Sequence, residues 1–191
     1  MQLTTSKKFT YQTRFRVGEE PERLLSNTAC LLSKVERSLF KDLYQKKKGI
    51  NELKTLYLKQ YGITARQFNS CRIKLEGKVL SYKVLLNDRI LNLEQKIAKL
   101  DKHIKRLKDP FKIHQKKRRL ALLKTKYEKL VKDKKEGKIR ICFGTKSLFN
   151  KQFYLEENDF VSHAEWKKIW EESRNSSFFL VGSKDETVRA K

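Results

Sequence analysis

The stretch from residue 79 to residue 131 constrains the fold more than any other part of the chain. From Leu86 onward its apolar residues recur at alternating intervals of four and three, the heptad spacing of a helix that packs against another helix. The first run is Val79, Leu86, Ile90, Leu93, Ile97, Leu100, Ile104 and Leu107, and the second is Ile113, Leu120, Leu123, Tyr127 and Leu130. Asp109-Pro110 separates the runs, and proline ends a helix because it lacks an amide proton and clashes with the preceding turn. The pattern predicts an antiparallel helical hairpin whose two apolar stripes bury each other.

The outward positions of this predicted hairpin are rich in lysine and arginine, as is the whole chain. The 191 residues include 46 Lys and Arg against 22 Asp and Glu, which gives a net charge of +24. Such an excess opposes compaction unless a polyanion neutralises it, so nucleic acid is the expected partner. An anionic membrane surface is the alternative. It is disfavoured because the hairpin already matches its own apolar stripe and leaves little apolar surface to enter a bilayer.

The cysteines and the hydropathy pattern bear on the expected location. Cys30, Cys71 and Cys142 are an odd, scattered set without a CxxC pair, which favours a reducing compartment and gives no support for a zinc ribbon. No apolar run of about 18 residues is present, and the first residues do not resemble a signal peptide. We therefore expect a cytoplasmic, nucleoid-associated protein that has no membrane partner.

Apolar residues alternate with polar ones at both ends of the chain. This period of two predicts a strand over residues 9–17 and a short strand over residues 139–143, and a buried strand is expected over residues 177–182. Between these ends the predicted elements are helices, one of which begins at a capping box formed by Thr64 and Gln67. The fold class expected from this order is α+β: a small sheet or barrel of N- and C-terminal strands, interrupted by a helical insertion that contains the long hairpin.

Basic and aromatic side chains on these predicted elements are the candidates for nucleic-acid contact. Arginine offers a planar fork for phosphate and can stack on a base, and aromatic rings stack on unpaired bases. The predicted phosphate contacts are Arg14, Arg16, Arg66, Arg72, Lys74, Arg118, Arg119, Lys146 and Lys151. The predicted stacking residues are Tyr11 and Phe149, with Phe153 and Trp166 also considered. Packing in a core is the favoured alternative for Phe149, Phe153 and Trp166.

Other kinds of site have little support in the sequence. No Ser/His/Asp or Cys/His set suggests a nucleophile, and His103, His114 and His163 lack cysteine or histidine neighbours at ligand spacing. The acidic pairs and clusters, such as Asp185-Glu186, consist of neighbouring residues, whereas two-metal sites need acids that converge from separate elements. We expect no catalytic residue, no metal, no cofactor and no small-molecule substrate.

The last third of the chain resembles the TnpB (OrfB) proteins of insertion sequences. The resemblance rests on a spaced set of motifs: residues 141–149 (ICFGTKSLF), Gln152-Phe153, His163 with Glu165-Trp166, and residues 178–187 (FFLVGSKDET). These proteins are RNA-guided DNA nucleases related to type V CRISPR effectors. The resemblance implies a wedge-like β domain formed by residues 1–18 and 138–191, with a helical recognition-like domain at residues 19–137. It also implies a guide RNA and target DNA as partners.

The chain departs from this family where its nuclease domain should begin. The RuvC-like domain of the family follows the wedge, whereas this sequence stops at Lys191. We therefore expect a chain that is not an enzyme by itself, with a separate nuclease domain or a full-length relative as a possible partner. Two alternatives remain open: a catalytically dead DNA-binding regulator, and a structural coiled-coil partner of another protein.

Overall fold

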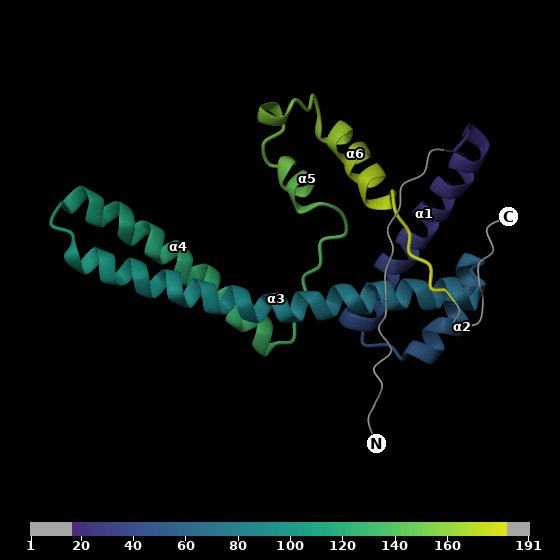
Figure 1. The fold of residues 1–191 in the computed structure, drawn as a ribbon, viewed down its shortest axis with the longest axis horizontal. Coiled ribbons are helices and arrows are strands. Elements are labelled where there is room, and N and C mark those ends of the chain that lie inside the picture. Colours follow the sequence, from purple (N-terminus) through teal and green to yellow (C-terminus); the bar gives the residue numbers. More distant parts are fainter. Residues whose placement is uncertain (1–16, 183–191) are drawn as a thin grey trace, which may run out of the picture.

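The structure is a computed structural model that describes residues 17–182, and within this range every regular element is a helix (Figure 1). The α-helices are α1 (Glu19–Phe40), α2 (Ile50–Tyr61), α3 (Ala65–Arg106), α4 (Pro110–Lys135), α5 (Lys146–Lys151) and α6 (His163–Asn175). A π-helix, η1 (Lys41–Gln45), directly continues α1, and a 3-10 helix, η2 (Glu156–Asn158), lies between α5 and α6.

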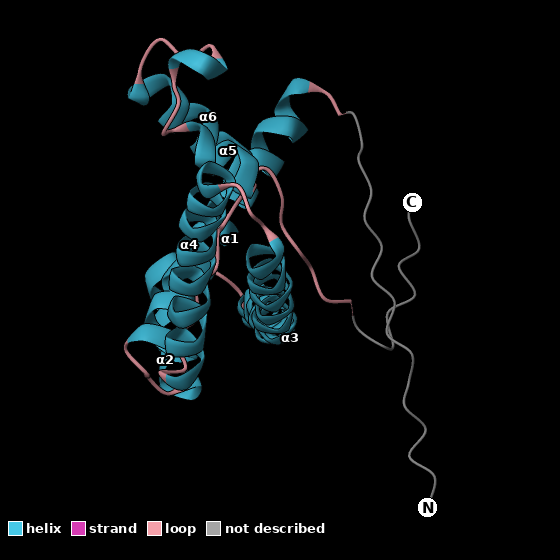
Figure 2. Ribbon diagram, turned by 90° about the vertical axis from the view of Figure 1, so that its left-hand side faces the viewer, coloured by secondary structure: helices cyan, strands magenta, loops and turns pink. Residues whose placement is uncertain are grey.

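The long helix α3 is the axis around which the other helices are arranged (Figures 1 and 2). It contains 42 residues, so it is about 60 Å long at 1.5 Å per residue. The predicted capping box starts it: the Thr64 side chain accepts a hydrogen bond from the Gln67 amide, and the Gln67 side chain accepts one from the Thr64 amide. The first half of α3 packs against α1 and α2, and the second half packs against α4.

The predicted hairpin is confirmed. Helix α3 ends at Arg106, the chain reverses, and α4 begins at Pro110. The Asp109 side chain caps α4 by accepting hydrogen bonds from the amides of Phe111 and Lys112. Of the heptad residues, Leu86 is buried at the base of the hairpin and those farther out are half-buried. This gradient follows from a two-helix assembly, in which each stripe is covered on one side only.

The main hydrophobic core lies where α1, α2 and the first half of α3 meet. Its fully buried side chains are Val35, Leu39, Leu53, Tyr57, Phe68 and Leu75. The Tyr57 hydroxyl keeps a partner inside this core by donating to the Asp42 carboxylate at 2.8 Å. The core therefore holds the base of the hairpin rigidly, while the rest of the hairpin projects away from it.

The prediction of an α+β fold with a sheet or barrel is wrong for the part of the chain that the structure describes. Residues 139–143 and 177–182 form no strand; instead, Ile139, Ile141, Phe143 and Phe178 pack against the helical core. The Val181 amide donates to the Ser70 hydroxyl of α3 at 3.1 Å, and Lys74 donates to the Ser177 carbonyl at 3.4 Å. The alternating pattern thus reflects an extended segment with one face on helices. The predicted strand at residues 9–17 lies outside the described residues except for Val17.

Helices α5 and α6 form a small aromatic unit that rests on α1. Trp166 and Trp170 of α6 are buried, and the Trp166 indole donates to the Leu148 carbonyl of α5 at 2.8 Å. Gly144 precedes α5 with a φ of +115°, and a Cβ at this position would lie 2.7 Å from the Trp170 ring. Only glycine fits both this backbone conformation and this close approach. The Arg37 guanidinium of α1 donates to the Asn175 side chain at 2.9 Å and ties the unit to the core.

Cysteine reactivity provides a first test of this fold. Cys71 is buried on α3, and burial, reinforced by the nearby Glu36 carboxylate, raises the pKa of its thiol to about 11. Since the thiolate is the reactive form, iodoacetamide at pH 8 should alkylate the exposed Cys30 while Cys71 stays unmodified. Peptide mass spectrometry would measure both sites, with guanidinium-unfolded protein as the control in which both react. Equal labelling rates in the folded protein would contradict the packing of α3 on α1.

Candidate nucleic-acid interface

The outer surface of the α3–α4 hairpin carries a dense set of cations, which we call the basic sleeve. The heptad seam faces inward on both helices, so the intervening lysines and arginines point away from it. The sleeve consists of Lys96, Lys99, Lys102, Lys105, Arg106, Lys108, Lys112, Lys116, Lys117, Arg118, Arg119, Lys124, Lys126 and Lys129. All of these side chains are exposed except Lys116, which is half-buried at a seam position. The sleeve therefore covers both arms and the loop between them.

Few acids balance the basic sleeve. Residues 96–129 contain Asp101, Asp109 and Glu128 as their acids. Asp101 pairs with Lys105 at 3.4 Å, and Asp109 pairs with Lys112 at 3.7 Å. No ion pair reaches Arg118 or Arg119 from the described residues. Exposed pairs of this kind contribute little stability, so the cations that remain repel one another, and a bound polyanion would relieve that repulsion.

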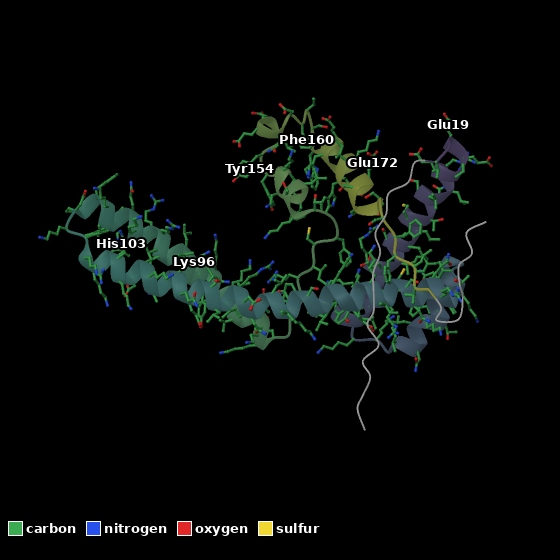
Figure 3. All side chains as sticks on the ribbon, in the orientation of Figure 1. Glu19, Lys96, His103, Tyr154, Phe160 and Glu172 are labelled. Atoms are coloured by element: carbon green, nitrogen blue, oxygen red, sulfur yellow. The ribbon has the colours of Figure 1, made fainter. Side chains whose placement is uncertain are left out.

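The other end of the molecule is close to electrical balance. Helix α1 begins with Glu19, Glu20 and Glu22 beside Arg23, and the three glutamates of α6 are matched by Lys167, Lys168 and Arg174. In Figure 3, Glu19 and Glu172 lie far from the hairpin, which is marked by Lys96 and His103. The contrast between the basic hairpin and this balanced end orients the molecule in the field of a polyanion, with the hairpin foremost.

The predicted contacts on α3 are already engaged within the chain. Lys74 lies 3.4 Å from the Glu36 carboxylate, and Lys78 lies 2.6 Å from the same carboxylate. Arg72 pairs with Glu76 at 3.0 Å. Arg66 is exposed in the first turn of α3. A phosphate contact by Arg72 or Lys74 would compete with these intramolecular pairs, so the basic sleeve is the stronger candidate surface.

The predicted contacts near the two ends of the chain fall into two groups. Arg14, Arg16 and Tyr11 lie outside the described residues. Lys146 and Lys151 lie on α5, where the Lys151 ammonium is 5.9 Å from the centre of the Phe160 ring. Helix α5 is therefore not part of the basic sleeve, and it carries two cations of its own.

Among the aromatic candidates, the structure separates packed rings from exposed ones. Trp166 is buried, and its indole N–H is occupied by the Leu148 carbonyl. Phe149 packs edge-on to Phe153 and against Trp170, with ring centres 6.3 Å and 5.5 Å apart. Phe153 and Tyr154 are exposed. Sequence reasoning did not select Tyr154, although it ends a stretch, residues 144–154, that contains no acidic residue.

Metal centres and membrane spans are the two other kinds of site that bear on function. Within residues 17–182, no group of three or more His, Cys, Asp or Glu side chains is placed to hold a metal ion. Over the same residues, none of the helices combines the length and the apolar character that a membrane span requires.

Comparison with known proteins identifies no relative. No family model, no curated protein and no solved structure matches this chain.

Proposed function

We propose that this chain binds structured RNA through the basic sleeve of the α3–α4 hairpin. The observation that carries the proposal is the composition of residues 96–129, where exposed lysines and arginines cover both arms with three acids among them. Phosphate backbones supply most of the affinity of such surfaces. A rigid, projecting helical pair also presents its cations without a large ordering cost on binding.

The charge pattern distinguishes this hairpin from an ordinary coiled coil. In a self-sufficient coiled coil, acidic and basic residues flank the seam and pair across it. Here nearly all charged residues of the basic sleeve are positive. The hydrogen bond from the Tyr127 hydroxyl to the Glu94 carboxylate, at 2.7 Å, lies at the end of the sleeve nearest the core. Helix α4 alone is about 39 Å long, which is enough to follow several phosphates of one backbone.

The resemblance to TnpB proteins supports a guide RNA as the specific ligand. Under this proposal the chain is the RNA-binding part of a TnpB-like RNA-guided nuclease, and target DNA pairs with the guide while the protein contacts duplex shape and backbone. The support comes from the residues quoted above in the last third of the chain, because the wedge-like barrel is absent from residues 17–182. Any nuclease activity would belong to a separate domain or a full-length relative.

A second candidate function, a coiled-coil partner protein, is favoured by one specific feature. Helix α3 has a further apolar stripe on the side away from its packed face, formed by Ile73, Leu80, Val84 and Leu91, all of which are exposed. A stoichiometric protein complex that survives ribonuclease treatment would favour this function. Preference for duplex DNA in the absence of RNA would instead favour a DNA-binding regulator.

The proposed function is tested by the nucleic acid that accompanies the purified protein. We expect a raised absorbance at 260 nm relative to 280 nm and, on sequencing, a defined small RNA. Binding of this RNA in fluorescence anisotropy should weaken steeply with salt, with a slope of about −0.7 to −0.9 in log K against log salt for each phosphate neutralised. A flat salt response would show that the basic sleeve is not the binding surface.

A further inference from the structure

Helix α3 carries a second line of apolar side chains that no described helix covers. We call this line the outer stripe, and its members are Ile73, Gly77, Leu80, Val84, Asn87 and Leu91. Its four apolar side chains are between 38% and 65% exposed. In Figure 2, where α3 is seen nearly end-on, the other helices lie above it and to its left. The apolar surface of the stripe is roughly 400 Å², a size typical of interaction sites on soluble proteins.

The spacing of the outer stripe is that of a coiled-coil seam. Its members follow one another at intervals of four, three, four, three and four residues, which is the heptad pattern. At 3.6 residues per turn they share one narrow face of α3, about 140° away from the face that packs on the other helices. Asn87 is the single polar side chain of the stripe, and one asparagine in such a seam fixes the register of two helices. The pattern therefore indicates packing on a further helix.

Gly77 indicates that this further helix approaches closely. A Cβ at Gly77 would have no atom of the described residues within 4 Å, and the residue is not among the glycines with positive φ. Neither the fold nor the local backbone conformation therefore requires glycine here. Glycine in the middle of a helix is less stable than alanine. Close contact with a second backbone would account for a glycine at this exposed position.

The outer stripe is complementary to a second copy of itself. In an antiparallel pair whose two-fold axis passes at Tyr82, residues at equal distances before and after Tyr82 face each other. The facing pairs are Ile73 with Leu91, Gly77 with Asn87, and Leu80 with Val84, which lie nine, five and two positions on either side of Tyr82. Each apolar side chain thus meets an apolar one. The one polar side chain meets the one residue that lacks a side chain.

The distribution of charge favours the antiparallel orientation. Lys96, the first residue of the basic sleeve, lies 14 positions after Tyr82. Antiparallel copies therefore place their sleeves at opposite ends, with the two Lys96 residues about 40 Å apart at 1.5 Å per residue, which is several Debye lengths at physiological salt. A parallel pair would bring the two sleeves within about 10 Å of each other, where they would repel.

The borders of the outer stripe present no run of like charge to a second copy. Arg72 and Lys74 already have carboxylate partners within the chain, at 3.0 Å and 3.4 Å. The exposed Lys83 and Asp88 have opposite signs. Contact between two stripes is therefore governed by their apolar side chains.

We propose that two copies of this chain form an antiparallel dimer through the outer stripe of α3. The contact is about 27 Å long at 1.5 Å per residue. It buries roughly 800 Å² of apolar surface from the two copies together with polar surface at its borders, and a contact of this size fits a weak, reversible dimer with a micromolar Kd. This proposal goes beyond RNA binding and does not require it. The dimer presents one basic sleeve at each end.

Sedimentation equilibrium of the full chain, treated with nucleases and held at about 300 mM salt to screen surface charge, tests the proposal. We expect the wild type to show a monomer–dimer equilibrium between about 1 and 200 µM. The variant L80E/V84E brings four acids together at the centre of the contact, so it should dimerise about a hundredfold more weakly, with unchanged helical circular dichroism. The matched control L24E/V161E adds the same charge at two exposed apolar positions outside α3 and should dimerise as the wild type does.

A third variant, L80E/V84K, tests the orientation. Because Leu80 faces Val84 in the antiparallel pair, this variant sets an acid opposite a base, whereas a parallel pair would set like charges opposite each other. We expect it to dimerise within about tenfold of the wild type and to weaken as salt rises. If L80E/V84K is as weak as L80E/V84E, the antiparallel register is wrong.

Two outcomes would overturn the dimer itself. One is a wild type that stays monomeric up to about 200 µM, well above a micromolar Kd, and the other is an L80E/V84E variant that dimerises as the wild type does. A different protein would then be the remaining candidate occupant of the outer stripe. The RNA-binding test of the proposed function uses nucleic acid and residues of the basic sleeve, so it succeeds or fails separately from this one.

Discussion

Reversal of Arg118 and Arg119 to glutamate is expected to weaken RNA binding about a hundredfold without loss of folding. Both side chains are exposed on α4, and no ion pair reaches either of them within residues 17–182. A charge-assisted hydrogen bond to phosphate contributes about 1.5–3 kcal/mol, so the removal of two such bonds accounts for an effect of this size. The salt dependence should change with the affinity, since each phosphate that the variant no longer neutralises reduces the slope by about 0.7 to 0.9. Anisotropy titrations of a fluorescein-labelled RNA hairpin over a salt series would measure both quantities.

The matched control for this prediction is the variant K41E/K59E. It makes the same change in net charge at two exposed positions on η1 and α2, away from the hairpin. We expect this variant to lose less than about threefold in affinity, because charges more than a Debye length from the ligand are largely screened at physiological salt. Equal losses of affinity in the two variants would mean that net charge, rather than the basic sleeve, determines binding.

The hairpin and the start of α3 could be predicted from sequence because local patterns determine them. A helix with a heptad repeat needs only one partner helix. Because the chain reverses at Asp109-Pro110, the next helix of the same chain becomes that partner. The capping residue Thr64 likewise acts on an amide within the first turn of its own helix. Each of these features depends on neighbours a few residues away, so tertiary context has little power to override it.

The sheet was predicted wrongly because an alternating apolar pattern does not show whether another strand or a helix covers the apolar face of the segment. Ile139, Ile141 and Phe143 alternate as a strand would, yet the surface that covers them is the helical core. The same limit applies to the candidate contacts. Lys74 resembles any other basic residue in the sequence, and only the fold brings it to Glu36, 38 positions earlier in the chain. Pairings between distant residues carry no local sequence pattern.

Replacement of Glu36 by alanine is expected to destabilise the protein by about 3 kcal/mol. The Glu36 side chain is 3% exposed on α1, and it holds both Lys74 and Lys78 of α3. Its removal leaves two ammonium groups beside the core without their anion, and breaking a buried pair in this way costs about 3–5 kcal/mol. We expect the lower end of this range of destabilisation because the Lys74 and Lys78 side chains are 22% and 35% exposed to solvent. Thermal unfolding by circular dichroism should show a midpoint lower by roughly 6–12 °C.

The control E76A tests whether burial is the cause of this effect. Glu76 also pairs with a cation of α3, Arg72 at 3.0 Å, but its side chain is 47% exposed, so its removal should cost less than about 0.5 kcal/mol. A triple variant, E36L/K74M/K78M, should recover most of the stability that E36A lacks, because an apolar set of similar volume needs no charge compensation. If the unfolding midpoint of E36A lies within about 2 °C of the wild-type value, well short of the expected shift, the three charges do not join α1 to α3. The rigid base that we assign to the hairpin must then come from apolar packing alone.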